Sequence, residues 1–130
     1  MIEKYVRAAS WKEALAAKAE FGADARPVNG GTDLLVKLRA GAVAPGVILD
    51  LTRVERLRQM RRTKTALILG AGVTAQQCLR DAWIRDRFPA LWRACQWLGG
   101  PQMQHVATLG GNLANASPAA DTVPALMALG

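Results

Sequence analysis

The sequence predicts an α/β fold, and three observations support this class. The chain has 130 residues, which is about the size of one domain. Apolar residues make up 51% of it and charged residues 21%, a balance that excludes a disordered chain. Short β-branched runs alternate with Ala- and Leu-rich segments, with glycines between them. That alternation is typical of βαβ units with parallel strands.

The N-terminal third carries clear start and stop signals. Ser10 followed by Glu13 is a capping-box pattern, so we expect a helix over residues 11–21 that ends at Gly22. The stretch 25–29 predicts a short strand leading to a Gly-Gly pair.

A second helix and strand follow that glycine pair. Thr32 and Asp33 can cap a helix over residues 34–41. The apolar run 47–51 follows a Pro-Gly turn and predicts another strand.

The C-terminal two thirds repeat the alternation less regularly. Residues 65–72 predict a strand that enters a glycine turn, and Thr74 with Gln77 predicts a capped helix. The stretch 81–88 is expected to be helical, and another helix is expected from Pro89 to Leu98.

The last thirty residues are predicted as a turn-rich piece, a strand and a helix. The turn-rich piece covers 101–106, the strand covers 107–110, and an apolar helix begins near Ala119 and is interrupted or restarted at Pro124. A helix that is apolar on most sides is normally buried, so we expect a partner or a further stretch of chain to cover it. No apolar run has the roughly 20 residues that a membrane span requires.

Charge and cysteine content narrow the function classes. The net charge is +7, and residues 53–64 hold six basic residues and one acidic residue. Such a run indicates nucleic acid, an anionic ligand, an acidic partner or simply a solvated face. No aromatic residue interleaves with it, so a base-stacking surface is not indicated. Two cysteines are too few for a disulfide framework, and the N-terminus lacks a signal-like apolar stretch, so we expect a cytoplasmic protein.

Three glycine turns are candidate ligand sites. The first, residues 28–35, lies between a strand and a helix, where free N–H groups and the helix dipole suit a phosphate or pyrophosphate. The second, residues 70–75, matches G-x-G-x-x-A but lacks the acidic residue that would hold a ribose after a following strand. A structural turn is therefore favoured there, with a nicotinamide-dependent Rossmann oxidoreductase as an alternative.

The third turn, residues 107–122, concentrates Thr, Asn, Ser and Asp among glycines and alanines. These side chains can form neutral hydrogen bonds to phosphate and hydroxyl oxygens. We expect the pyrophosphate of a dinucleotide to lie between the first and third turns. A basic nucleic-acid-binding domain that uses residues 53–64 remains a second alternative.

Two motifs carry a family resemblance. NGGTDLLVKLR at 29–39 and ATLGGNLANASPAADTVPALMAL at 107–129 resemble the FAD-binding medium subunit of the xanthine dehydrogenase and carbon monoxide dehydrogenase (molybdenum hydroxylase) family. The resemblance covers essentially the whole chain. It implies the flavin-binding fold shared with vanillyl-alcohol oxidases, in which FAD lies between two small α/β subdomains. Residues 1–52 would form the first subdomain, and residues 53–130 would form the start of a second, truncated one.

The resemblance also assigns roles to residues. It implies that the first loop wraps the pyrophosphate with backbone N–H groups and that the second grips it from the other side. Asp121 would bond the polar chain of the cofactor, and Leu98 would lie near the flavin. The full set of expected FAD-binding residues is Pro27, Val28, Asn29, Gly30, Gly31, Thr32, Asp33, Leu34, Leu98, Thr108, Leu109, Gly110, Gly111, Asn112, Ser117 and Asp121.

As implied by the resemblance, electrons arrive from a molybdenum-binding large subunit through [2Fe–2S] clusters on a small subunit. They pass through FAD to NAD+ or another acceptor. Two cysteines cannot supply the four ligands of such a cluster, and no residue here is needed as an acid or base. The sequence departs from the family pattern at Asn29, where alanine is usual, and at Gln104-His105, which replaces Arg-Asn.

Overall fold

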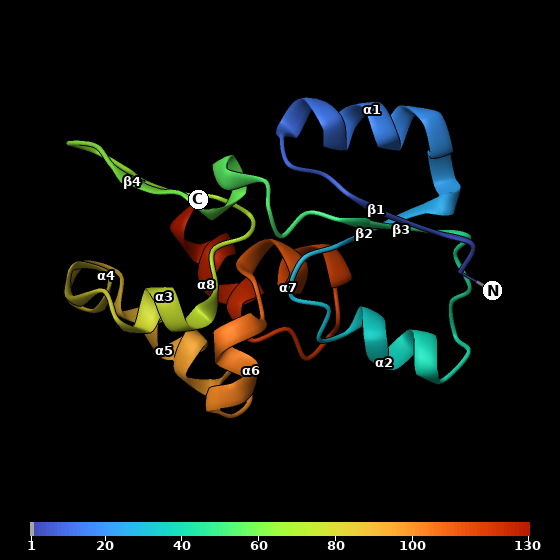
Figure 1. Ribbon diagram of the computed structural model, residues 1–130. Helices are drawn as coiled ribbons and strands as arrows, with labels where there is room; N and C mark the ends of the chain where they lie inside the picture. Colours follow the sequence, from blue (N-terminus) through green and yellow to red (C-terminus); the bar gives the residue numbers. More distant parts are fainter. Residues whose placement is uncertain (1) are drawn as a thin grey trace.

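The N-terminal part of the chain, residues 2–52, is built on a parallel sheet. The computed structural model describes residues 2–130. The sheet has the strand order β1-β3-β2, with all pairs parallel. Helix α1 lies on one side of it and helix α2 on the other (Figure 1). The element bounds are β1 Lys4–Arg7, α1 Trp11–Phe21, the 3-10 turn η1 Gly22–Asp24, β2 Ala25–Val28, α2 Leu34–Arg39 and β3 Val47–Asp50.

The C-terminal part, residues 53–130, is mainly helical. It begins with a 3-10 turn and an antiparallel β4–β5 hairpin, which projects away from the sheet (Figure 1). Six helices follow. The bounds are η2 Glu55–Arg58, β4 Met60–Arg62, β5 Leu67–Leu69, α3 Ala75–Leu79, α4 Ala82–Arg87, α5 Pro89–Trp97, α6 Pro101–Val106, α7 Leu109–Asn115 and α8 Thr122–Leu129.

Each part has a hydrophobic cluster of its own. The first joins α1 to the sheet through Ala14, Ala17 and Leu49, and it includes Val54 just beyond residue 52. The second is larger and gathers the helices of the C-terminal part. Its buried members are Val73, Ala75, Cys78, Ile84, Leu91, Cys95, Leu98, Ala107 and Leu109. The mixed α/β fold expected from the sequence is confirmed.

Glycines allow the two parts to approach at backbone distance. A Cβ added to Gly30 would lie 2.0 Å from the carbonyl oxygen of Val106. A Cβ added to Gly72 would lie 2.7 Å from Nδ2 of Asn29. Since Cβ atoms do not occur at such separations, the first glycine turn can pack on the C-terminal part only without side chains at these positions.

Both predicted capping boxes begin helices. The hydroxyl of Ser10 accepts the Glu13 N–H at the start of α1, and the Thr74 hydroxyl accepts the Gln77 N–H at the start of α3. At α4, the Asp81 carboxylate accepts two backbone N–H groups.

Several predicted elements differ from the structure. Residues 4–7 and 60–62 form strands β1 and β4, which the sequence reading missed. Residues 101–106 form helix α6, because Pro101 occupies the first helical turn, where its missing N–H costs nothing. Residues 107–110 do not form a strand. Thr108 makes an isolated bridge with Thr74 and then caps α7.

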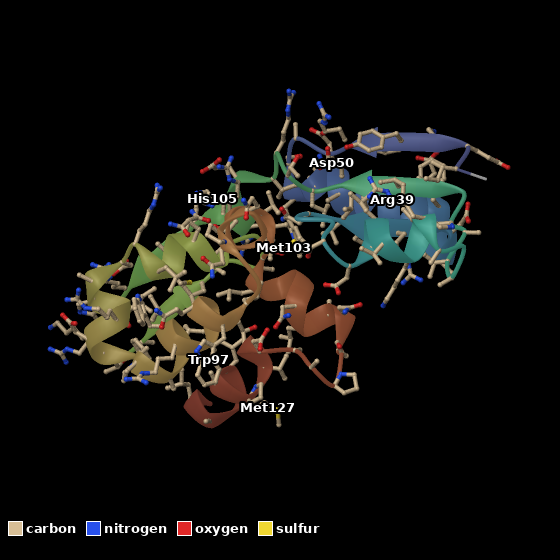
Figure 2. All side chains as sticks on the ribbon, turned by 90° about the horizontal axis from the view of Figure 1, so that it is seen from below. Arg39, Asp50, Trp97, Met103, His105 and Met127 are labelled. Carbon is tan, nitrogen blue, oxygen red and sulfur yellow. The ribbon has the colours of Figure 1, made fainter. Side chains whose placement is uncertain are left out.

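The final helix runs unbroken from Thr122. Pro124 stands in its first turn, where backbone N–H groups have no intrahelical acceptor, so it does not interrupt α8. Helix α8 packs on α5, yet Met127 is 77% exposed and Trp97 of α5 is 74% exposed. Figure 2 shows both side chains at the same edge of the molecule. Among residues 2–130, no helix has the length and apolar character needed to cross a bilayer.

Candidate functional site

A cavity of about 540 Å³ lies between the two parts of the chain, in the size range of small-molecule and cofactor sites. The first glycine turn forms one wall, and α6, α7 and their connections form another. The expected site residues that line it are Pro27, Val28, Asn29, Gly30, Gly31, Thr32, Asp33, Leu34, Leu98, Thr108, Gly111, Asn112 and Asp121. The structure therefore brings together two segments that are about 80 positions apart in the sequence.

Residues 30–33 of the first glycine turn, called the open segment below, have backbone N–H groups that no protein group in the described residues accepts. Gly31 has φ +70°, a left-handed conformation that favours glycine. The predicted cap of α2 is wrong, because Asp33 already has helical backbone angles and its side chain caps nothing. Within residues 2–130, the backbone N–H groups of residues 30–33 donate to no protein acceptor. Four amide donors are thus available at the cavity wall.

Residues 109–111 of the third glycine turn, called the closed segment below, donate their backbone N–H groups to acceptors within the protein. The N–H groups of Leu109 and Gly110 donate to the carbonyl oxygens of Val73 and Ala71, each at 2.9 Å. The Gly111 N–H donates to the Thr108 hydroxyl at 3.1 Å. This segment therefore offers no row of free backbone amides over residues 109–111.

Side chains remain available on the second segment. The Thr108 hydroxyl accepts one bond and keeps its own proton to donate. Asn112 uses its Oδ1 to accept from the N–H and hydroxyl of Thr122, at 3.2 and 2.5 Å, which leaves its Nδ2 donors. This wall can contribute hydroxyl and amide donors where the opposite wall contributes backbone N–H groups.

The comparisons with known proteins agree with this geometry. The profile of the family described as "FAD binding domain in molybdopterin dehydrogenase" matches residues 1–130. This chain belongs to that family. The FAD-binding domain is 31% identical over 125 residues to the glyceraldehyde dehydrogenase medium chain of Sulfolobus acidocaldarius, covering 96% of this chain and 44% of the relative. It is 30% identical to the carbon monoxide dehydrogenase medium chain of Afipia carboxidovorans, covering 95% of this chain and 42% of the relative.

Solved structures give the same result. The domain matches reconstituted CO dehydrogenase from Oligotropha carboxidovorans with a TM-score of 0.88, at 26% identity, covering 94% of this chain and 42% of that one. It matches quinoline 2-oxidoreductase from Pseudomonas putida 86 with a TM-score of 0.83, at 28% identity, covering 90% and 40%. The chain therefore spans less than half the length of these relatives.

The residues of the FAD-binding domain fit its cofactor. The diphosphate of FAD is an anion rich in acceptors, and the open segment presents unpartnered N–H donors beside a residue that only glycine suits. The cavity is partly apolar, with Leu98 and Met103 in its lining, which suits a planar ring.

Three expected site residues do not line the cavity. Leu109 is buried in the second hydrophobic cluster. Gly110 packs on Ala71, where an added Cβ would lie 2.5 Å from the alanine Cβ. The Ser117 hydroxyl accepts the Ala119 N–H at 3.3 Å. The geometry gives these three residues roles in packing and turn formation.

The cavity lining also contains residues outside the expected FAD-binding set. They are Arg26, Lys37, Val43, Gly99, Met103, Ala107, Ala114 and Asn115. A helical spacing signal existed for Lys37, which follows Asp33 by four residues and so lies on the same side of α2. Asn115 lies within the third glycine turn, residues 107–122, whose polar side chains mark that turn as a candidate ligand site.

The other glycine turn is structural. The N–H groups of Gly70 and Gly72 donate to the carbonyl oxygens of Gln59 and Leu57, at 2.9 and 2.7 Å. The preceding strand, β5, pairs antiparallel with β4, whereas the Rossmann fingerprint requires a parallel βαβ unit. The alternative of a nicotinamide-dependent Rossmann oxidoreductase is therefore wrong. The preferred interpretation of residues 70–75 as a structural turn is confirmed.

A buried carboxylate at the end of β3 ties this strand to β1, its neighbour in the sheet. Asp50 is 2% exposed and accepts the Tyr5 hydroxyl at 2.5 Å, the Arg7 guanidinium at 2.8 Å and the Thr52 N–H at 2.8 Å. Burial alone raises the pKa of Asp50, but the hydrogen bonds from Tyr5, Thr52 and Arg7 outweigh it and lower the pKa to about 2. Val28, the last residue of β2 before the open segment, pairs with Asp50 and accepts the Leu51 N–H at 2.9 Å, so the network lies beside the point where this segment begins.

The remaining reactive side chains are two buried thiols and one histidine that contacts its own helix. Cys78 and Cys95 are free thiols and fully buried. The ring Nδ1 of His105 lies 2.7 Å from the carbonyl oxygen of Pro101, one helical turn earlier. Residues 2–130 contain no cluster of His, Cys, Asp or Glu that could hold a metal ion.

Proposed function

We propose that this chain holds FAD by its diphosphate and works as the flavin-binding part of a molybdenum hydroxylase. A molybdenum-binding large subunit and an iron–sulfur small subunit would supply electrons, and NAD+ or another acceptor would receive them. FAD, when bound, supplies the exchange between one-electron and two-electron chemistry. The task of this chain is to bind and orient it.

The observation that carries the proposal is the row of unpartnered amides at residues 30–33. Backbone N–H groups must be satisfied by protein, water or a ligand, and four consecutive N–H groups without a protein acceptor at a cavity wall form a ready set of donors for a bound anion. Here they line a cavity that also holds Thr108 and Asn112, whose side-chain donors approach from the other part of the chain. A diphosphate would satisfy donors on both walls at once.

We further propose that residues 1–52 and 53–130 act as two subdomains with the cofactor between them. The separate hydrophobic clusters support this division, although Val54 and Leu57 pack with the first cluster. The cavity lies at the junction of the two parts, so FAD would strengthen their association by contacting both. The two free cysteines favour a reducing compartment, and we expect the protein to act in the cytoplasm.

Titration of the chain with FAD, followed by quenching of flavin fluorescence, tests the binding proposal. We expect saturable binding of FAD and of ADP, which shares the diphosphate, and weaker binding of riboflavin, which lacks it. Absence of saturable FAD binding to the wild-type chain would overturn the proposal.

A pair of glycine variants separates the site from general backbone strain. Gly31 and Gly41 have nearly equal φ values, +70° and +68°, but only Gly31 lines the cavity. Gly31→Val and Gly41→Val introduce comparable backbone strain, and the Gly31 variant also brings its Cβ to 3.3 Å from the flexible side chain of Leu35. We expect FAD affinity to fall at least tenfold for Gly31→Val and to stay within about twofold for Gly41→Val. Equal losses would count against the open segment as the diphosphate site.

The acceptor is tested on the same complex. If NAD+ receives the electrons, NADH should bleach the visible absorbance of the bound flavin in an anaerobic stopped-flow experiment. If dithionite bleaches the flavin and NADH does not, another compound is the acceptor.

A further inference from the structure

One side-chain hydrogen bond joins the two parts of the chain across the cavity. The Nζ of Lys37 on α2 lies 2.5 Å from the Oδ1 of Asn115 at the end of α7. Within the described residues 2–130, no other side-chain hydrogen bond or salt bridge connects residues 2–52 with residues 53–130. Both side chains line the cavity, so the contact spans the space where the ligand would bind.

The electrostatic setting of Lys37 is unusual. The cations that line the cavity are Arg26 and Lys37, and the carboxylates are Asp33 and Asp121. In the part of the chain that the structure describes, Lys37 forms no ion pair, although Asp33 stands four residues before it. Its ammonium is instead directed to a neutral amide oxygen. A full positive charge therefore lies at the cavity with only a neutral acceptor.

We propose that Lys37 binds a phosphate oxygen of the cofactor and that Asn115 holds the ammonium near that position in the free protein. The inference rests on the proposed function, because it assigns a residue to the same diphosphate. When an anion enters, the ammonium exchanges a neutral acceptor for a charged one. The bond to Asn115 has a charge on the donor alone, whereas a phosphate oxygen adds the attraction between opposite charges, so the exchange favours the bound state.

The position of Lys37 supports this role. It lies on α2, the helix that directly follows the open segment 30–33, so its ammonium and the free amides belong to one continuous wall. A lysine is a compact charge on a flexible stem, which can leave Asn115 without moving the backbone. The amides fix where the diphosphate lies, and Lys37 neutralises part of its charge.

Substitutions at both ends of the hydrogen bond test the assignment. Affinities for FAD, ADP and riboflavin are measured by fluorescence and calorimetric titration. We expect Lys37→Met to weaken FAD and ADP about fivefold, because an exposed charge-assisted bond is lost, and to leave riboflavin within about twofold. Lys37→Arg should restore most of the affinity for FAD and ADP.

Asn115→Ala distinguishes a phosphate ligand from a structural clasp. This variant breaks the same hydrogen bond but leaves the ammonium in place. If Lys37 binds phosphate, Asn115→Ala should weaken FAD less than Lys37→Met does. If the bond only holds the two parts together, the two variants should weaken FAD, ADP and riboflavin equally, and the proposal is wrong.

The matched control is Arg39→Gln, which removes an exposed cation from the same helix at a position outside the cavity lining. We expect it to leave FAD affinity within about twofold. The dependence of FAD affinity on salt should be shallower for Lys37→Met than for wild type and Arg39→Gln. If wild type binds FAD and Lys37→Met binds it equally well with the same salt dependence, this inference fails while the proposed function stands.

Discussion

The two Gly-Gly segments of this domain look alike in sequence and differ in what they leave available. Gly30-Gly31 and Gly110-Gly111 each precede or begin a helix, and both lie at the junction of the two parts of the chain. Yet the first keeps its backbone N–H groups free, whereas the second donates its own to Val73, Ala71 and Thr108.

The glycines are needed for different reasons. Gly31 requires freedom of φ, while Gly30 and Gly110 require space, because Val106 and Ala71 lie where a side chain would be. At Gly111 an added Cβ would lie 2.8 Å from the Thr108 hydroxyl that caps its own helix. One Gly-Gly pair therefore presents donors to a ligand, and the other lets the opposite wall pack close enough to face it.

The largest effect should come from Gly30→Val. The new side chain would meet the Val106 carbonyl oxygen, a backbone atom that cannot rotate away, so the two parts must separate. We expect FAD binding to be lost and the free energy of unfolding to fall by about 3 kcal/mol, measured by fluorescence titration and urea denaturation. Gly100→Ala is the control, since the nearest atom to its new Cβ is Gln102 Oε1 at 3.5 Å, an ordinary contact. FAD binding retained by Gly30→Val would show that the close approach is dispensable.

The next effect concerns the buried carboxylate beside the open segment. Asp50→Asn removes the buried charge that Tyr5 and Arg7 bind, and we expect a loss of about 2 kcal/mol in the free energy of unfolding at neutral pH. Urea denaturation measures it. Thr52→Ala should cost less than Asp50→Asn, because the backbone N–H of Thr52 that Asp50 accepts at 2.8 Å is kept.

The same carboxylate predicts a pH dependence. The pKa of Asp50 in the folded state is about 2, below its ordinary value of 3.8, so its contribution is present above pH 4. As the pH falls from about 4 towards 2, the carboxylate is protonated and the contribution is lost. Wild type should therefore lose more stability than Asp50→Asn over this range. Parallel pH profiles for the two proteins would contradict the assignment.

The sequence was informative where the physics is local. The capping boxes at Ser10 and Thr74 depend on side chains three residues apart, and both helices begin as predicted. The lining of the cavity by both Gly-Gly segments was also anticipated through the motif. Strand β1 was missed because three of its four residues are exposed, so no apolar alternation marks it.

Tertiary contacts explain the remaining differences. Whether the N–H groups of Leu109 and Gly110 are free depends on Val73 and Ala71, which lie far away in sequence, and no local pattern reports on it. The Lys37–Asn115 hydrogen bond joins residues 78 positions apart, so no local sequence pattern could predict it either. Sequence reasoning identified the segments that meet and missed which of their groups remain unpaired after they meet.

A smaller effect tests the closed segment. Thr108→Val removes the hydroxyl that accepts the Gly111 N–H and should lower the free energy of unfolding by about 1 kcal/mol, as for other helix caps. Thr74→Val should lower stability by a similar amount through the loss of its capping box, yet Thr74 does not line the cavity. If the Thr108 hydroxyl also donates to the cofactor, only Thr108→Val should weaken FAD in a fluorescence titration. Equal FAD affinities for the two variants would limit Thr108 to its capping role.

The smallest expected effect is at Asn29, which directly precedes the open segment. Its side chain contacts Gly72 and, among the described residues, makes no hydrogen bond to protein. If the open segment binds through its backbone, Asn29→Ala should change FAD affinity less than twofold and stability by about 0.5 kcal/mol or less. A tenfold loss of FAD affinity would mean that this side of the cavity contributes a side chain as well as its amides. In that case the two sides of the cavity would not differ as proposed, because both would present side-chain donors to the same diphosphate.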